Sequence, residues 1–254
     1  ELIRPILRGR DIKRYGYEWA GLYLIATFPS RHYDIELYPA VKKFLLSFAK
    51  ESLIESGYQW VADSYLEEFC KQKLEQSGRF IEIQGKRIRI GKDDEKSRKK
   101  TSNKWFETQD SISYWEDFSK PKIVWAELAR TGNAFALDFE NHMVGNTGYV
   151  LTCPSSSHQE LLYLLAFLNS RSTLYSLNHL TTRFDENGWR WLRQFVEQLH
   201  IPPFIQMENI LSIVSSINKE NKRDISEEIN NAIADIYGLS EEEVEYINNS
   251  LLGY

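Results

Sequence analysis

The first half of the chain contains short apolar and aromatic segments bounded by turn residues, a pattern typical of β-strands. Residues 23–28 lie between Gly21 and Pro29, and residues 79–84 alternate apolar with polar side chains. Gly85 then interrupts the alternation, which resumes over residues 86–90 and predicts a hairpin. Residues 122–127 and 149–152 are predicted to form further strands.

Helical spacing occurs between these strands. Pro39 is tolerated in the first turn of a helix, and Val41, Phe44, Leu45 and Phe48 follow it at helical intervals. A second helix is predicted at about residues 61–76. The first half of the chain should therefore mix strands with helices.

The pattern changes to a helical period near residue 155. Ser157 is a candidate N-cap, and Glu160 three residues later completes a capping-box pattern before a leucine-rich, buried helix. Further helices are predicted at residues 188–199 and 204–218, then along Ile225, Ile229, Ile233 and Ile236, and finally from Ser240, whose first turn is acidic. We therefore predict an α+β fold, with an α+β region at residues 1–155 and a helical region at residues 156–254 that packs on it.

Composition excludes several protein classes. The 254 residues are 42% hydrophobic, enough for a sizeable core. We find no apolar run long enough for a transmembrane helix and no signal-peptide pattern at Glu1, which looks like an internal cut in a longer protein. Cys70 and Cys153 stand far apart without metal-ligand spacing, so we expect free thiols and a cytoplasmic protein with no membrane partner.

The charge is unevenly distributed, although the net charge is only −5. Residues 205–254 hold ten acids against three bases, which leaves the rest of the chain slightly basic. Residues 86–104 hold nine bases against three acids, and residues 92–103 contain no apolar side chain. An exposed basic loop of this kind would gain free energy beside DNA, because its cations release counterions from the phosphates, or it could simply be a solvated loop.

The chain contains no recognisable catalytic constellation. Residues 201–204, Ile-Pro-Pro-Phe, lack the Asn that an adenine methyltransferase tetrapeptide needs, and no glycine-rich cofactor loop is present. The five histidines are scattered without metal-ligand spacing. Asp34 and Glu36 give only a loose match to a Mg²⁺ nuclease pattern. Binding chemistry is therefore better supported than catalysis.

Four short phrases in a fixed order resemble a known family. They are residues 4–15 (RPILRGRDIKRY), 120–125 (KPKIVW), 165–170 (LAFLNS) and 198–204 (QLHIPPF). Together they look like the TaqI-like specificity domain, the target recognition domain of fused type II restriction–modification enzymes and adenine-specific DNA methyltransferases. The resemblance implies a β-rich target recognition domain with inserted helices, followed by a C-terminal helical bundle.

The resemblance implies that this chain reads double-stranded DNA and is not itself an enzyme. Catalytic parts would lie in an N-terminal methyltransferase region of the same polypeptide, with S-adenosylmethionine as its cofactor and Mg²⁺ for any fused nuclease; no cofactor or metal is expected in this chain. Guanidinium groups suit phosphates and the O6/N7 edge of guanine, and polar turns can line a DNA-facing cleft. The candidate DNA-binding residues are Arg8, Arg10, Lys13, Arg14, Lys99, Lys100, Lys104, Arg130, Asn133, Asn146 and Arg183.

Other interpretations of the same residues stay open. The bases of residues 4–14 could form a solvated turn or pair with Asp11 and Glu18, and Arg183, predicted to lie between two helices, could cap one of them. At the level of the whole protein, the chain could be a specificity subunit of a multi-subunit restriction system, part of a methyltransferase of a related phage-defence system, or a small stand-alone nuclease.

Overall fold

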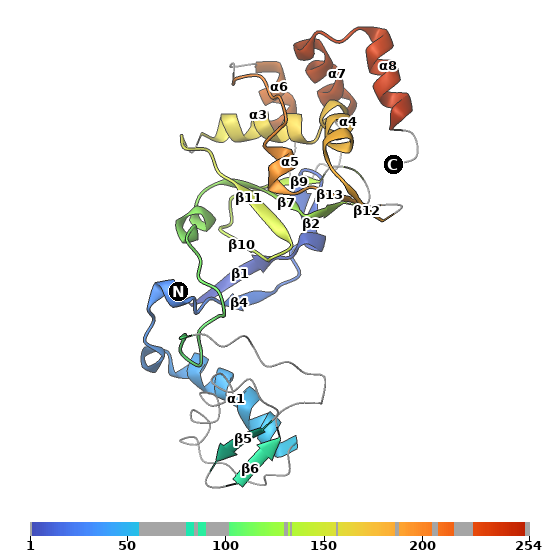
Figure 1. The fold of residues 1–254 in the computed structure, drawn as a ribbon. Helices are drawn as coiled ribbons and strands as arrows, with labels where there is room; N and C mark the ends of the chain where they lie inside the picture. Colours follow the sequence, from blue (N-terminus) through green and yellow to red (C-terminus); the bar gives the residue numbers. More distant parts are fainter. Residues whose placement is uncertain are drawn as a thin grey trace. The chain divides into compact units, whose positions relative to one another are not determined.

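The computed structural model describes residues 2–55, 80–83, 86–89, 102–129, 132, 134–155, 157–185, 188–204, 208–215 and 226–251 (Figure 1). The chain divides into two compact units. Unit 1 consists of Glu1–Ile3 and Ile25–Ser113, and unit 2 consists of Arg4–Leu24 and Tyr114–Tyr254. The prediction that the chain divides near residue 155 into an α+β and a helical region stays a prediction.

Unit 1 contains two 3₁₀ turns, a helix and a hairpin. They are η2 (Pro29–Arg31), η3 (Ile35–Leu37), α1 (Pro39–Glu55), β5 (Phe80–Ile83) and β6 (Lys86–Arg89). The antiparallel pairing of β5 with β6 confirms the predicted hairpin. Helix α1 begins at Pro39 as predicted, but Phe44 and Phe48 are 52% and 54% exposed. The helix predicted at residues 61–76 and the basic residues 92–100 lie outside the described residues.

Three small sheets of the described residues lie mainly in unit 2, and only Ile3 and Ile25 at their ends are assigned to unit 1. The first has the order β11–β7–β9 and is antiparallel: β11 is Gly148–Leu151, β7 is Lys122–Ala126 and β9 is Phe135–Asp138. The second has the order β10–β1–β4, with β10 at Met143–Val144, β1 at Ile3–Leu7 and β4 at Tyr23–Ile25. The third has the order β12–β13–β8: β12 is Arg183–Asp185, β13 is Gly188–Arg190 and β8 is Leu128–Ala129. A short pair, β2 (Ile12–Lys13) with β3 (Gly16–Tyr17), and the 3₁₀ turns η1 (Gly9–Asp11) and η4 (Trp115–Ser119) also belong to unit 2.

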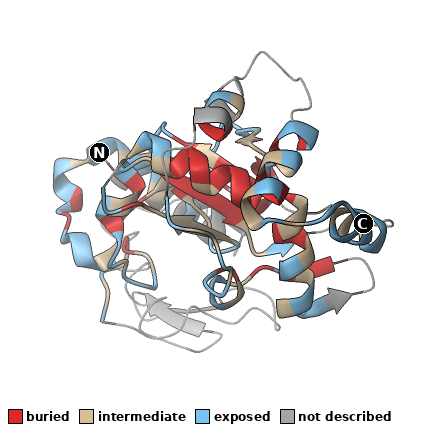
Figure 2. Ribbon diagram, turned by 90° about the horizontal axis from the view of Figure 1, so that it is seen from above, coloured by how far each residue is buried: buried red, intermediate tan, exposed pale blue. Residues whose placement is uncertain are grey.

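The core of unit 2 lies between the β11–β7–β9 sheet and the helix α3 (His158–Leu168). Ile123, Val124 and Trp125 of strand β7 are all buried, because α3 covers one face of the strand and the N-terminal segment covers the other. Helix α3 is buried over most of its circumference, as its leucines predicted. Figure 2 shows the buried residues, in red, gathered on this helix and the strands beside it.

Capping side chains mark the helix boundaries that the sequence predicted. The Ser157 hydroxyl accepts a hydrogen bond from the Glu160 N–H, which confirms Ser157 as the N-cap of α3. The reciprocal half of the capping box is absent, because the Glu160 carboxylate accepts from the Ser155 hydroxyl instead. Helix α4 (Arg171–Leu180) follows with Ser170 as its N-cap.

Three C-terminal helices pack on α3 and α4: α6 (Glu208–Ser215), α7 (Ser226–Tyr237) and α8 (Glu241–Ser250). Ile229 and Ile233 of α7 are fully buried, as their spacing predicted. Helix α8 begins with a complete capping box formed by Ser240 and Glu243. The α+β class is therefore confirmed, with helices gathered at the C-terminal end of the sequence.

Two helical predictions are wrong in their bounds. Residues 188–199 do not form one helix, because β13 occupies Gly188–Arg190 and only the short α5 (Arg193–Val196) is helical. Trp189 pairs across the sheet with both Ala129 and Arg183, so tertiary pairing overrides the apparent helical period. Phe204 itself is not helical, and the described part of the helix predicted at residues 204–218 is α6 (Glu208–Ser215); residues 205–207 and 216–218 lie outside the described residues. Within the described residues, no helix has both the length and the apolar character needed to span a bilayer.

Candidate nucleic-acid interface

Two turns of unit 2 lie side by side at one edge of a sheet. Strands β1 and β10 are parallel, so the chain leaves both at the same end, and the Gly145 N–H donates to the Leu7 carbonyl over 2.9 Å. The Gly9 N–H reaches the Thr147 hydroxyl at 3.4 Å. A Cβ atom on Gly9 would lie 3.0 Å from the Thr147 carbonyl oxygen, so a larger residue would crowd the two turns at this distance.

Arg8 and Asp11 build the first of these turns. The Arg8 N–H donates to the Asp11 carboxylate over 2.9 Å, and the Asp11 N–H donates back to the Arg8 carbonyl over 2.9 Å. The Arg8 side chain pairs with the same carboxylate, with Nη2 at 2.7 Å from Oδ1. Asp11 is buried, and these bonds hold the pKa of its carboxyl below the ordinary value, so the pair is ionised at neutral pH.

The remaining polar residues of the two turns face solvent. Arg10 and Lys13 are exposed, and among the described residues neither forms a salt bridge. The Lys13 ammonium donates to the Arg10 carbonyl over 2.9 Å. Asn146 is exposed at the tip of the second turn, which the Gly148 N–H closes onto the Gly145 carbonyl at 3.0 Å. Flexible cations and an exposed amide can therefore meet a partner here without first breaking ion pairs.

Two residues that the sequence did not single out extend this edge. The Glu127 N–H donates to the Thr147 carbonyl over 2.9 Å, and its carboxylate lies 3.5 Å from Arg190 Nη1. Arg190 is exposed on β13, which pairs with β8. Sequence reasoning missed it because the segment was interpreted as a helix. We refer to Arg8, Arg10, Glu127, Asn146 and Arg190 together as the arginine edge.

Three other candidate residues take part in packing elsewhere. The Arg14 guanidinium donates to the Asn169 carbonyl and lies 5.4 Å from the centre of the Tyr15 ring. Arg183 lies between α4 and α5 along the chain, as predicted, and belongs to strand β12; its guanidinium lies 4.5 Å from the Trp189 ring centre. Lys104 belongs to unit 1, where its ammonium reaches the Tyr33 carbonyl at 3.5 Å and lies 5.6 Å from the centre of the Phe106 ring.

Four candidates, Lys99, Lys100, Arg130 and Asn133, lie outside the described residues. Their assignment to DNA binding stays a prediction, as it does for the described candidates.

A buried ionic network supports the sheet behind these turns. The Lys122 ammonium lies 2.5 Å from the Asp138 carboxylate, and both side chains are fully buried. The same carboxylate lies 2.9 Å from His142 Nδ1 and accepts from the Tyr17 hydroxyl over 3.1 Å. Burial would raise the pKa of Asp138, but the Lys122 charge and these hydrogen bonds outweigh it and hold that pKa below the ordinary value. Lys122, Asp138 and His142 are all buried, so the role of this network is structural.

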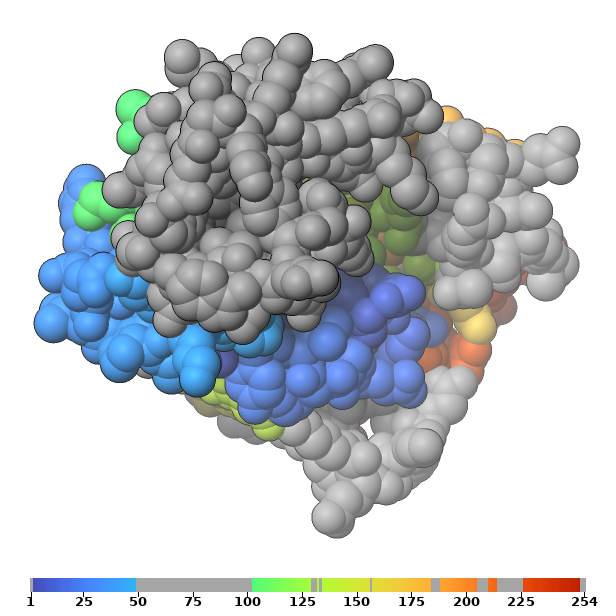
Figure 3. Space-filling model, turned by 90° about the horizontal axis from the view of Figure 1, so that it is seen from below, coloured from blue at the N-terminus to red at the C-terminus, as the bar shows by residue number. Residues whose placement is uncertain are grey.

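Residues near the N-terminus also present aromatic surface, and the N-terminal segment is visible in blue in Figure 3. The Trp19 ring meets the Tyr23 ring edge-on at 5.2 Å and the His142 ring at 5.4 Å. Trp19 is 38% exposed and Tyr23 is 59% exposed. This cluster supplies apolar contact area but no cation.

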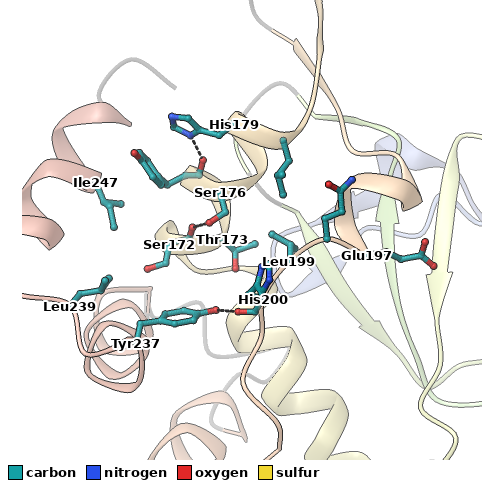
Figure 4. Close-up of a pocket in the computed structure, with 13 residues that line it drawn as sticks. Ser172, Thr173, Ser176, His179, Glu197, Leu199, His200, Tyr237, Leu239 and Ile247 are labelled. Atoms are coloured by element: carbon teal, nitrogen blue, oxygen red, sulfur yellow. Dashed lines mark hydrogen bonds between the residues drawn. The ribbon is translucent and has the colours of Figure 1, made fainter.

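A cavity of about 820 Å³ lies among the C-terminal helices, lined by residues of α4, α7, α8 and the segment after α5 (Figure 4). Its polar groups largely bond to the backbone: His179 Nδ1 lies 2.7 Å from the Tyr175 carbonyl, and the Tyr237 hydroxyl donates to the His200 carbonyl over 2.8 Å. No arginine or lysine lines its described wall, so it does not suit phosphate.

Reactive and metal-binding groups are also missing from the described part of the chain. Burial raises the pKa of the Cys153 thiol to about 11, so this free cysteine is protonated and unreactive at neutral pH. No group of three His, Cys, Asp or Glu side chains in the described ranges could hold a metal ion. The site chemistry that is present is hydrogen bonding and positive charge.

The fold and the arginine edge define a class of protein: an α+β domain whose described turns present paired and unpaired cations at the edge of a sheet. The chain belongs to the TaqI-like C-terminal specificity domain family, whose model matches residues 67–201. This membership assigns it to DNA sequence recognition in restriction–modification, and a specificity domain is not itself catalytic. The matched range contains residues 120–125 and 165–170 and part of 198–204, whereas residues 4–15 precede it. A search of curated proteins returned no match.

Proposed function

We propose that this chain is the sequence-reading domain of a fused type II restriction–modification enzyme that methylates adenine in double-stranded DNA. The observation that carries this proposal is the parallel pairing of β1 with β10, which brings the turn of Arg8 and Arg10 beside the turn of Asn146. Directional donors on a rigid sheet are what direct readout of base edges requires.

Phosphate contacts and base contacts have different requirements, and the edge offers both. Arg10 and Lys13 are exposed cations on long side chains, which suit phosphates and fix register without reading sequence. Asn146 presents an amide, which can donate to and accept from the N6/N7 edge of adenine. Arg190 and Arg183 would extend the contact along β13 and β12, and Lys99, Lys100 and Lys104 would add electrostatic attraction.

Catalysis is proposed to reside in an N-terminal methyltransferase region of the same polypeptide. That region would bind S-adenosylmethionine and extrude the target adenine from the duplex, and any Mg²⁺-dependent nuclease would also lie outside this chain. The composition of the chain supports this division, because a glycine-rich cofactor loop and an Asn before Pro202 are both missing from the sequence.

Selection from a pool of randomised duplexes tests the proposal. The 254-residue chain should enrich one short sequence motif at moderate salt. Enrichment of duplexes without any shared motif would show a non-specific cation surface and would contradict the proposal.

Calorimetric titration with S-adenosylmethionine tests whether the cofactor site lies outside this chain. The chain should show no binding of S-adenosylmethionine, and binding at micromolar concentration would place a cofactor site within these residues.

A further inference from the structure

We propose that Arg8 reads a guanine base through the outer end of its guanidinium group, and that Asp11 is the positioning residue that fixes its orientation. This inference rests on the proposed function, since it assigns a base to one residue of the arginine edge.

The hydrogen bonds of Arg8 use one side of its guanidinium group. Nε lies 3.0 Å from Asp11 Oδ2, and Nη2 lies 2.7 Å from Asp11 Oδ1. A guanidinium carries five N–H donors, so this side-on pairing leaves three, two on Nη1 and one on Nη2. Among the described residues, Nη1 has no hydrogen-bond partner. The unused donors lie at the far end of the group, away from Asp11.

The orientation of this free end is set before any partner binds. Asp11 is only 4% exposed, and its carboxylate is also held by the Arg8 N–H over 2.9 Å. Gly9 seats the same turn against Thr147 so closely that a Cβ atom would be crowded. A guanidinium held at both its backbone and its side chain loses little conformational entropy when it binds.

Charge distinguishes a base contact from a phosphate contact for this residue. The Asp11 carboxylate neutralises the Arg8 charge within the pair, so a phosphate would gain little attraction and would be repelled by the carboxylate beside it. A neutral base edge is not repelled by Asp11, and it can accept two parallel hydrogen bonds from the unused N–H groups of Arg8. Arg10 and Lys13, which lack such a partner in the described structure, are the phosphate-type cations.

Guanine is the base that fits these donors. Its major-groove edge presents two acceptors, O6 and N7, whereas adenine presents one acceptor and one donor there. Two parallel N–H groups on a fixed plane match the guanine edge and meet the adenine amino group as donor against donor. The Arg8 side chain is 33% exposed, so a duplex can reach it.

The first experiment compares variants by selection from randomised duplexes. The unmodified chain should enrich a motif with at least one G·C pair, and Arg8→Ala should lose preference at one such pair by about 10- to 100-fold while the other positions keep theirs. Arg10→Ala is the matched control from the same turn, and it should weaken all duplexes equally. If Arg8→Ala also weakens all duplexes equally, Arg8 contacts phosphate and the inference is overturned.

A change in the DNA tests the same contact without any risk to folding. Replacing the guanine with 7-deazaguanine removes the N7 acceptor, so the unmodified chain should bind about 5- to 10-fold more weakly, as expected for the removal of one hydrogen bond at an edge. Arg8→Ala should not distinguish the two duplexes. Equal binding of both duplexes by the unmodified chain at every G·C position would overturn the inference.

Asp11→Asn tests the positioning role. It should reduce the guanine preference while raising affinity for unrelated duplexes, because it frees the Arg8 charge. A purely structural residue would lower both affinities together. If the unmodified chain enriches no motif, the proposed function and this inference fail together; if it enriches a motif whose G·C positions ignore Arg8, only the inference fails.

Discussion

At the scale of single residues, the buried Asp138 carboxylate holds more of unit 2 together than any exposed ion pair. Asp138→Asn would leave the Lys122 charge buried without its partner, so the free energy of unfolding should fall by about 3–5 kcal/mol. Urea denaturation measures this change. Asp117→Asn is the matched control, because it breaks the exposed Lys120 pair and should cost less than about 1 kcal/mol.

The same carboxylate predicts a dependence of stability on pH. Since its pKa is lowered in the folded protein, its contribution is complete above the unfolded value of about 4 and is lost as the pH falls through the folded value. The loss of stability on acidification should therefore be shallower in Asp138→Asn than in the unmodified chain. Equal acid sensitivity of the two proteins would show that other carboxyl groups dominate this range.

Gly148 provides a second test at residue scale. A Cβ atom there would lie 2.4 Å from Val144 Cγ1 and 3.2 Å from the Trp125 carbonyl oxygen. Gly148→Ala should therefore destabilise the chain by about 1–3 kcal/mol through overpacking. At Gly16, in strand β3, a Cβ atom would meet nothing within 4 Å, so Gly16→Ala should be close to neutral in the same denaturation assay. Equal effects of the two substitutions would contradict the steric explanation.

At the scale of elements, the corner between α3 and α4 explains one of the sequence phrases. The Asn169 side chain accepts from the Phe135 N–H over 3.1 Å and donates to the Phe135 carbonyl over 2.9 Å. It therefore satisfies both backbone groups of Phe135 at the edge of β9, where the Tyr15 N–H also donates to the Phe135 carbonyl. The next residue, Ser170, caps α4 through the Thr173 N–H.

Asn169→Ala should remove the side-chain hydrogen bonds that join the α3–α4 corner to Phe135 of β9. The buried Phe135 N–H would lose its acceptor, which should lower the free energy of unfolding by about 1–3 kcal/mol. Amide exchange of Phe135 should accelerate more than that of Val124 in β7, which keeps its strand partners. An unchanged exchange rate at Phe135 would show that water or a rearranged part of the chain replaces the Asn169 side chain as acceptor for the Phe135 N–H.

The elements that patterning missed share a physical cause. Strands β12 and β13 are only three residues each, and the sequence predicts a single helix across residues 188–199. Trp189, Trp191 and Val196 of this segment are all buried. These side chains are buried by different partners: β13 pairs with β8, while Trp191 stacks on Phe135. The spacing of apolar residues along the chain cannot show whether they are buried against one neighbouring element or against several.

At the scale of the whole molecule, the uneven charge predicts which parts attract DNA. Changing Lys99, Lys100 and Lys104 to Gln should weaken binding of all duplexes about equally. The slope of log affinity against log salt should become shallower by about 0.9 for each phosphate that the variant no longer neutralises. An unchanged slope would show that these lysines only solvate their segment.

The acidic helix α8 supplies the opposite control. Changing Glu241 and Glu242 to Gln should leave the enriched motif unchanged, because phosphate repels an acidic surface; Glu243 is kept because its carboxylate caps the helix through the Ser240 N–H. A motif that shifts in this variant, but in none of the arginine-edge variants, would show that the polarity of the interface is reversed.

The sequence alone determined the α+β class, the β5–β6 hairpin, the start of α3 at Ser157 and the buried face of α7. Each depends on local periodicity or a capping side chain, which act within a few residues. It also identified Arg8 and Asn146 as candidates, and four phrases identified the family.

Only the tertiary structure decided how those candidates combine. The pairing of β1 with β10 joins residues about 140 positions apart, and it places the turn of Arg8 and Gly9 beside Thr147. Thr147 in turn accepts from the Glu127 N–H, and the Glu127 carboxylate lies 3.5 Å from Arg190. Asp11 could be interpreted from sequence as a neutralising partner of any nearby base, but its burial and its side-on bonds to Arg8 make it a positioning residue. Such roles depend on distances between segments that no local pattern encodes, because long-range pairing is set by the packing of the whole unit.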